Sequence, residues 1–102
     1  MKASVKKAWV KALRSGEYKQ GQQWLCDAQE NYCCLGVLYD VAVDADWIFS
    51  GGCWSTANES DAFLSGYNDA LGLSRSHEIA LANMNDAGTP FSEIADWIEA
   101  NL

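Results

Sequence analysis

Residues 32–42 read YCCLGVLYDVA, an almost continuous apolar run that starts with two adjacent cysteines. A run of this length with apolar residues at i, i+3 and i+7 indicates a buried helix rather than a strand. The helical face consists of Leu35, Leu38, Val41 and Ala42. We therefore predict a helix over residues 34–43. Its internal glycine, Gly36, costs about 1 kcal/mol relative to alanine, so we expect another element to pack closely against that turn.

Both ends of the chain carry amphipathic helix patterns. Ser4 is expected to cap a helix that runs to about Arg14 and is ended by Gly16. Thr89 is expected to cap the last helix, with Pro90 at its first position, where a missing N–H costs little. The apolar stripes that would join these helices in one core are Val5, Ala8, Trp9, Ala12 and Leu13, and Phe91, Ile94, Ala95, Ile98 and Leu102.

The middle of the chain carries weaker signals. Short pieces that favour strands, 23–26 and 32–33, flank a group of turn formers and predict a small hairpin. Residues 44–59 form the least regular stretch, which we expect to be a loop. Two further helices are expected after it: one over 60–71, capped by Ser60 and ended by Gly72, and a shorter one that follows Ser76 and runs to Met84.

These elements predict a mainly α fold of the α+β class, with four to five short helices and a small β-hairpin, as a single compact domain over residues 1–102. Hydrophobic residues make up 49% of the chain, which is enough to build one core and excludes disorder. No stretch reaches the roughly 18 to 20 apolar residues that span a bilayer, and the first residues lack the apolar region of a signal peptide. We therefore expect a soluble cytoplasmic protein with no membrane partner.

The net charge of −7 is unevenly distributed. Residues 1–19 hold six of the seven basic groups against one acid, Glu17, which gives them +5 and leaves −12 on the rest of the chain. An acidic body repels nucleic-acid phosphates over most approach directions, so we expect no direct nucleic-acid partner. The same charge has an alternative use, as an acidic mimic of nucleic acid towards a basic protein.

The basic first helix allows two interpretations. A basic amphipathic helix can lie on a membrane or bind a partner's groove. We favour a terminal helix that docks on the core through Trp9 and Leu13, because its apolar stripe is narrow and two of the five members are alanines.

The four cysteines, Cys26, Cys33, Cys34 and Cys53, lack the spacing of a metal site. Structural zinc sites use pairs about two to four residues apart, whose thiolates can point at one ion. We therefore expect no metal and no cofactor, but buried free thiols in a reducing compartment. A cysteine nucleophile would need the single histidine, His77, as its base, and nothing in the sequence positions a third group.

Three stretches together resemble a known family: WVKALRSGEYKQG at 9–21, YCCLGVLYDVA at 32–42 and LANMNDAGTPFSEIADWIE at 81–99. They are similar to a family of small uncharacterised proteins of phage and prophage genomes, with a CCLGVL…LNDxGxxFxEIADxIE pattern. The resemblance covers about half the chain, and this sequence departs from the pattern at Met84, which replaces a leucine. The motif positions here are Cys33, Cys34, Leu35, Gly36, Asn85, Asp86, Gly88, Phe91 and Ile94. The resemblance implies a phage accessory protein in a bacterial cytoplasm and supplies no mechanism.

Small size, many aromatic residues and the lack of a catalytic pattern favour a non-enzymatic interaction module. The phage resemblance implies that its partner is a bacterial host protein, with an anti-defence role as one version of this hypothesis. Trp47, Phe49 and Trp54 are the residues that we expect at the contact, since exposed aromatic side chains anchor interfaces.

Two other classes of function stay open. A small ligand such as a nucleotide would be bound, or hydrolysed, in a pocket lined by Trp54, Tyr32, Asn85 and Asp86, which requires that these residues converge. The acidic nucleic-acid mimic is the other alternative, and it requires carboxylates arranged in a row.

Overall fold

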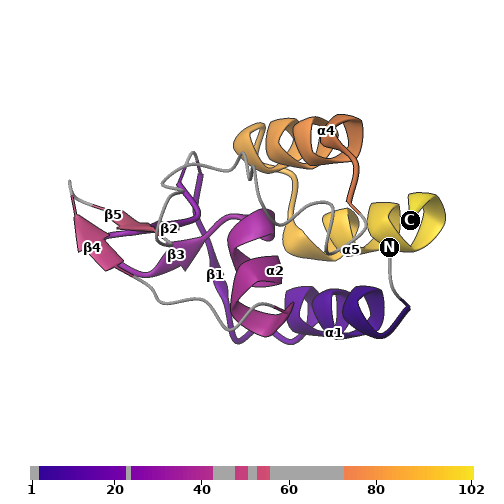
Figure 1. Ribbon diagram of the computed structural model, residues 1–102, viewed down its shortest axis with the longest axis horizontal. Coiled ribbons are helices and arrows are strands. Elements are labelled where there is room, and N and C mark those ends of the chain that lie inside the picture. The colour runs from indigo at the N-terminus through magenta and orange to yellow at the C-terminus, as the bar shows by residue number, and fades with distance from the viewer. Residues whose placement is uncertain (1–2, 23, 43–47, 51–52, 56–72) are drawn as a thin grey trace.

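The computed structural model describes residues 3–22, 24–42, 48–50, 53–55 and 73–102 (Figure 1). These residues form four helices and five short strands that share one sheet. The helices are α1 (Ala3–Arg14), α2 (Cys34–Ala42), α4 (Arg75–Asp86) and α5 (Phe91–Asn101), and the strands are β1 (Lys19–Gln20), β2 (Cys26–Asp27), β3 (Asn31–Tyr32), β4 (Ile48–Ser50) and β5 (Cys53–Ser55). A mainly helical α+β fold is confirmed, and the helix expected over 60–71 lies outside the described residues.

Figure 1 shows the helices gathered at one end of the molecule and the sheet at the other. Helix α2 stands between these two parts and packs against α1, α4 and β3. Helix α5 contacts α1 on one side and α4 on the other, so the two ends of the chain share one core. The sequence prediction of a core that joins the first and last helices is therefore correct.

Helix α1 docks on that core as a terminal helix. Trp9, Val10 and Leu13 are buried, and Val10 joins the stripe that the periodicity assigned to this helix. The indole Nε1 of Trp9 donates a buried hydrogen bond of 2.9 Å to the carbonyl oxygen of Cys34. Trp9 thus combines the burial of a large aromatic surface with a bond to the first residue of α2.

Helix α2 packs on the backbone of the segment that precedes β2. A Cβ built on Gly36 would lie 2.0 Å from the carbonyl oxygen of Leu25, a distance that no real Cβ occupies. The same carbonyl accepts the N–H of Cys33 at 3.2 Å, so it is held in place from two sides. The close approach predicted from a glycine inside a buried helix is confirmed.

The sheet has the strand order β1-β3-β2-β5-β4. Strands β2 and β3 form the predicted hairpin, with Cys26 opposite Tyr32, and β1 pairs with β3 in parallel. The Asp27 carboxylate closes the hairpin turn, because it accepts the N–H groups of Gln29 and Asn31 at 2.9 Å. Glu30 takes the positive φ of 61° that this turn needs.

The loop expected over 44–59 is wrong in part, because 48–50 and 53–55 are the paired strands β4 and β5. Two glycines separate these strands in the sequence, and a Gly-Gly pair between short β-favouring pieces is a hairpin signal. The low regularity of the stretch favoured a loop, but the Gly-Gly pair is the more informative signal.

Two predicted helix caps are also corrected. Helix α1 already includes Ala3, so Ser4 lies within it. Pro90, not Thr89, is the N-cap of α5, because Thr89 belongs to the end of α4. The Thr89 N–H donates to the Met84 carbonyl at 3.0 Å. The N–H of Gly88, whose φ is 89°, donates to the Asn85 carbonyl. These two bonds form a Schellman motif, which satisfies the last carbonyls of α4.

Candidate functional site

One row of register partners runs across all five strands of the sheet. From one edge to the other its members are Gln20, Tyr32, Cys26, Trp54 and Phe49. Adjacent strands lie about 4.8 Å apart, so the positions of Tyr32 and Phe49 are separated by about 14 Å. The sheet therefore brings together three of the six residues that the sequence marked for binding, and we call these five residues the cross-strand row.

Tyrosine side chains extend the row at the β3 side. The rings of Tyr18 and Tyr32 meet edge to face with their centroids 5.0 Å apart. The Tyr18 hydroxyl donates a 2.5 Å hydrogen bond to the Asp40 carboxylate on α2, and the Tyr32 hydroxyl donates to the Cys26 sulfur. The aromatic surface is thus fixed to the helix beneath it and to the neighbouring strand.

A shallow cavity of about 360 Å³ opens beside these tyrosines. Glu17, Lys19 and Glu30 line it with Tyr18 and Tyr32. Burial raises the pKa of Tyr32 to about 12, with Cys26 and Asp40 adding to the shift. Burial is also the largest cause of the raised pKa of Tyr18, followed by its bond to Asp40. Both phenols are therefore neutral hydrogen-bonding groups at physiological pH and do not act as bases.

Asn85 is fully buried and holds three segments together. Its Oδ1 accepts the N–H of Cys34 at 3.1 Å and the Nε2 of Gln20 at 3.1 Å, while its Nδ2 donates to the carbonyl of Gly21 at 2.7 Å. Its Oδ1 thus binds at the N-terminus of α2, and its Nδ2 binds beside β1. These bonds occupy the polar atoms of Asn85, so we assign it a structural role in the fold.

The remaining site candidates are placed as follows. Asp86 is exposed at the end of α4 and does not line the cavity beside Tyr32. Trp47 lies outside the described residues, and for Phe49 and Trp54 the structure gives the strand register alone. The hypothesis of a ligand pocket required four residues to converge. Asn85 instead lies inside the core and Asp86 on the surface, whereas Tyr32 and Trp54 share the cross-strand row.

The cysteine pair that opens α2 belongs to the core. Cys33 and Cys34 are both buried; the Cys33 sulfur accepts the N–H of Gly36 at 3.3 Å and the Cys34 thiol faces the Leu81 carbonyl at 3.6 Å. Burial raises the pKa of Cys33 to about 12 and that of Cys34 well above its ordinary value. Among the described residues no group of three or more histidine, cysteine or acidic side chains is arranged to hold a metal ion.

Cys26, Cys33 and Cys34 are expected to resist thiol reagents in the native protein. Ellman's reagent attacks the thiolate, and burial raises the pKa of Cys26 to about 11 and of Cys33 to about 12. At pH 8 we expect their reaction to be at least about 100-fold slower than in denaturant, followed by absorbance and assigned by mass spectrometry. Rapid native labelling of Cys33 or Cys34 would contradict their assignment to the core.

Ionisation of the same thiols is expected to lower the free energy of unfolding at high pH. The native protein keeps thiol protons that the unfolded chain releases from a pKa of about 8.5 upwards. Fewer bound protons in the unfolded state mean that the free energy of unfolding falls as pH rises. The fall extends from about pH 8.5 towards the raised native pKa of about 12 for Cys33.

The sequence interpretation missed Tyr18, Cys26 and Asp40 as parts of one surface. A signal was present for Tyr18, because it is the tyrosine of SGEY in the first of the three stretches that carry the resemblance. Cys26 and Asp40 had no such signal, since their approach to the tyrosines depends on strand register and on the position of α2.

Comparison with known proteins gives one match. A family model described as "Domain of unknown function (DUF8296)" matches residues 1–51, which include α1, the β1–β3 segment and α2. Neither the search of curated proteins nor the search of solved structures found a match. Within the described residues no helix is long and apolar enough to cross a membrane.

Proposed function

The chain belongs to the family described as a domain of unknown function, DUF8296, whose model covers half of it, and we propose that it is a non-enzymatic protein-interaction module. In this proposal it is a phage- or prophage-encoded accessory protein that acts on a bacterial host protein. The phage setting rests on the resemblance of the CCLGVL and NDAGTPF stretches, and the host partner rests on that setting.

The cross-strand row is the observation that carries this proposal. It places Tyr32, Trp54 and Phe49 in one row of register partners, with Cys26 of β2 between Tyr32 and Trp54, although they are up to 22 residues apart in the sequence. Aromatic residues are enriched at the energetic centres of protein interfaces because they desolvate a large area with few rotatable bonds. In Figure 1 the β4–β5 end of this row lies farthest from the four described helices.

The chemistry of the described residues supports binding rather than catalysis. The polar atoms of Asn85 are used within the core, and the thiols of Cys33 and Cys34 are buried and neutral. The phenols of Tyr18 and Tyr32 have raised pKa values, so neither supplies a base near neutral pH. These groups support a rigid platform, and rigidity lowers the entropy cost of binding a partner.

Capture of a partner from a bacterial lysate tests the proposal. The tagged chain is expected to retain one protein in stoichiometric amount, identified by mass spectrometry. Trp54→Ala and Phe49→Ala are each expected to weaken retention by about 30-fold, the effect of losing about 2 kcal/mol at an interface centre. Circular dichroism of each variant separates loss of binding from loss of fold.

The matched control is Trp24→Ala, which removes a tryptophan that is 39% exposed and lies outside the cross-strand row. It is expected to leave retention within about threefold of the parent chain. Full retention by folded Trp54→Ala and Phe49→Ala, or equal loss with Trp24→Ala, would contradict a contact centred on the row. Retention of a small molecule in place of a protein would favour the ligand-binding alternative.

A further inference from the structure

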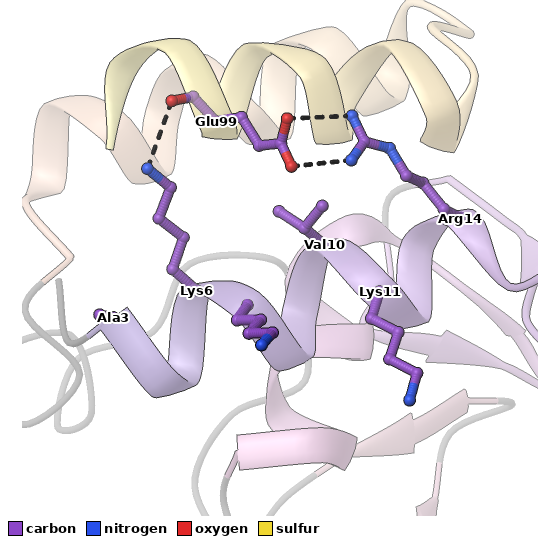
Figure 2. Close-up of a pocket in the computed structure, with 7 residues that line it drawn as sticks. Ala3, Lys6, Val10, Lys11, Arg14 and Glu99 are labelled. Carbon is purple, nitrogen blue, oxygen red and sulfur yellow. Dashed lines mark hydrogen bonds and ion pairs between the residues drawn. The ribbon is translucent and has the colours of Figure 1, made fainter.

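A basic groove follows helix α1 beside α5, as Figure 2 shows. Its volume is about 640 Å³. Ala3 and Val10 form its apolar part, and the basic residues around them are Lys6, Lys7, Lys11 and Arg14. Glu99 of α5 supplies the one acidic side chain of the lining, and we call this set of residues the basic groove.

The basic side chains of the groove differ in whether they bond to other groups of the protein. Arg14 bonds both oxygens of Glu99, at 2.8 and 3.3 Å, and also bonds Asp96. Lys6 reaches the backbone carbonyl of Glu99 at 3.3 Å. Lys7 and Lys11 are exposed, and Figure 2 shows that Lys11 extends away from α5. The α5 side of the groove is therefore neutralised, while the outer side keeps a positive charge.

The groove has the shape of a track along one helix. Ala3, Lys7, Lys11 and Arg14 follow one another three or four residues apart, so they form one stripe of α1. Eleven residues of helix rise about 16 Å, which corresponds to about five residues of extended chain. A peptide segment therefore fits the groove better than a single small anion does.

Two other occupants conflict with the structure. Trp9 and Leu13, the largest apolar side chains of α1, are buried against the core, and Val10 reaches the groove with only 5% of its surface exposed, so α1 has no broad apolar face to insert into a lipid surface. A long polyanion such as nucleic acid would meet the −12 charge of the remaining chain. A short segment at the groove lies within about one Debye length, 8 Å at physiological salt, of the lysines.

We propose that the basic groove binds an acidic peptide segment of a partner protein. The segment's carboxylates pair with Lys7 and Lys11, which lie one helical turn apart, and an apolar side chain between them rests on Val10. This site is separate from the cross-strand row, so the two surfaces serve one partner or two. It extends the interaction function but does not depend on the row.

The test uses a fluorescein-labelled synthetic peptide of glutamates interrupted by leucine, with binding followed by fluorescence anisotropy at physiological salt. The parent chain is expected to bind it saturably. The double variant Lys7→Glu with Lys11→Glu is expected to bind at least about 30-fold more weakly, because two ion pairs become repulsive. The unfolding transition of the double variant establishes that it is folded.

Lys19→Glu on β1 is the matched control, since Lys19 is an exposed basic residue outside the groove. Combined with Arg75→Glu at the start of α4, which is also exposed and outside the groove, it alters net charge as much as the double groove variant does, and this pair is expected to change binding by less than about threefold. Equal weakening by both double variants would overturn the proposal in favour of net charge. No saturable binding, or tighter binding of inorganic polyphosphate than of the peptide, would also overturn it. The lysate capture is a separate measurement, so either surface can fail alone.

Discussion

Gly36→Ala is expected to destabilise the protein by about 3 kcal/mol or more. Alanine is intrinsically better than glycine in a helix by about 1 kcal/mol, so helix propensity alone predicts the opposite sign. The added Cβ would lie 2.0 Å from the Leu25 carbonyl oxygen, which is backbone and already accepts the Cys33 N–H. Either α2 or the segment before β2 must therefore move. Urea unfolding followed by circular dichroism measures the loss.

Gly16→Ala is the matched control for this prediction. Gly16 follows α1 with a φ of 78°, and a Cβ there meets no atom within 4 Å. Its replacement is expected to cost only about 1 kcal/mol, the price of a left-handed conformation for an alanine. A cost for Gly36→Ala no larger than that for Gly16→Ala would contradict the close contact between α2 and Leu25.

Asn85→Ala is expected to cost about 4 kcal/mol. The change leaves the buried Cys34 N–H and the Gly21 carbonyl without their partner and frees one bond of the Gln20 side chain. A buried polar group without a partner costs about 1 to 3 kcal/mol, and this change removes the partner of more than one polar group. Since a domain of this size has only about 5 to 15 kcal/mol of stability, we expect a large fall in the urea midpoint.

The control for Asn85 is Asn83→Ala, two residues earlier on the same helix. Asn83 is exposed, and alanine has the higher helix propensity, so stability should change by less than about 0.7 kcal/mol. Equal effects at the two positions would mean that Asn85 does not join α4 to α2 and β1. Retained stability in Asn85→Ala would contradict the structural role assigned to this residue.

Gly36 and Asn85 are motif positions, and both have structural roles. Gly36 allows the backbone contact with Leu25, and Gly88 supplies the positive φ that ends α4. Asn85 joins the second motif stretch to the first through the N–H of Cys34. Phe91 and Ile94 are buried core residues of α5. Apart from the exposed Asp86, the motif residues thus hold the fold together, which makes the motif a poor guide to a binding surface.

The helical part of the fold was predictable from local patterns. Apolar residues at helical spacing placed α2 and α5 almost to the residue, and Gly16 marked the end of α1. Caps were less predictable, because the role of Thr89 depends on whether its N–H completes the preceding helix. Local sequence does not encode that choice.

The sheet and the surface it builds were only partly predictable. The β2–β3 hairpin has its turn residues beside it, whereas the pairing of β2 with β5 joins Cys26 to Trp54 across 28 residues. Register over such a distance depends on the packed core and leaves no local pattern. The same reason explains why Tyr32 was expected only in the ligand pocket and Phe49 only at the protein contact, although register places both in one row with Trp54.

Hydrogen–deuterium exchange of the captured complex, compared with the free chain, tests most directly where the partner binds. We expect slower exchange in residues 48–55 and in the β2–β3 hairpin, with α4 unchanged. Protection by the partner in α1 alone would place the contact at the basic groove. Protection centred on Asn85 and α4 would contradict the claim that the cross-strand row is the binding surface.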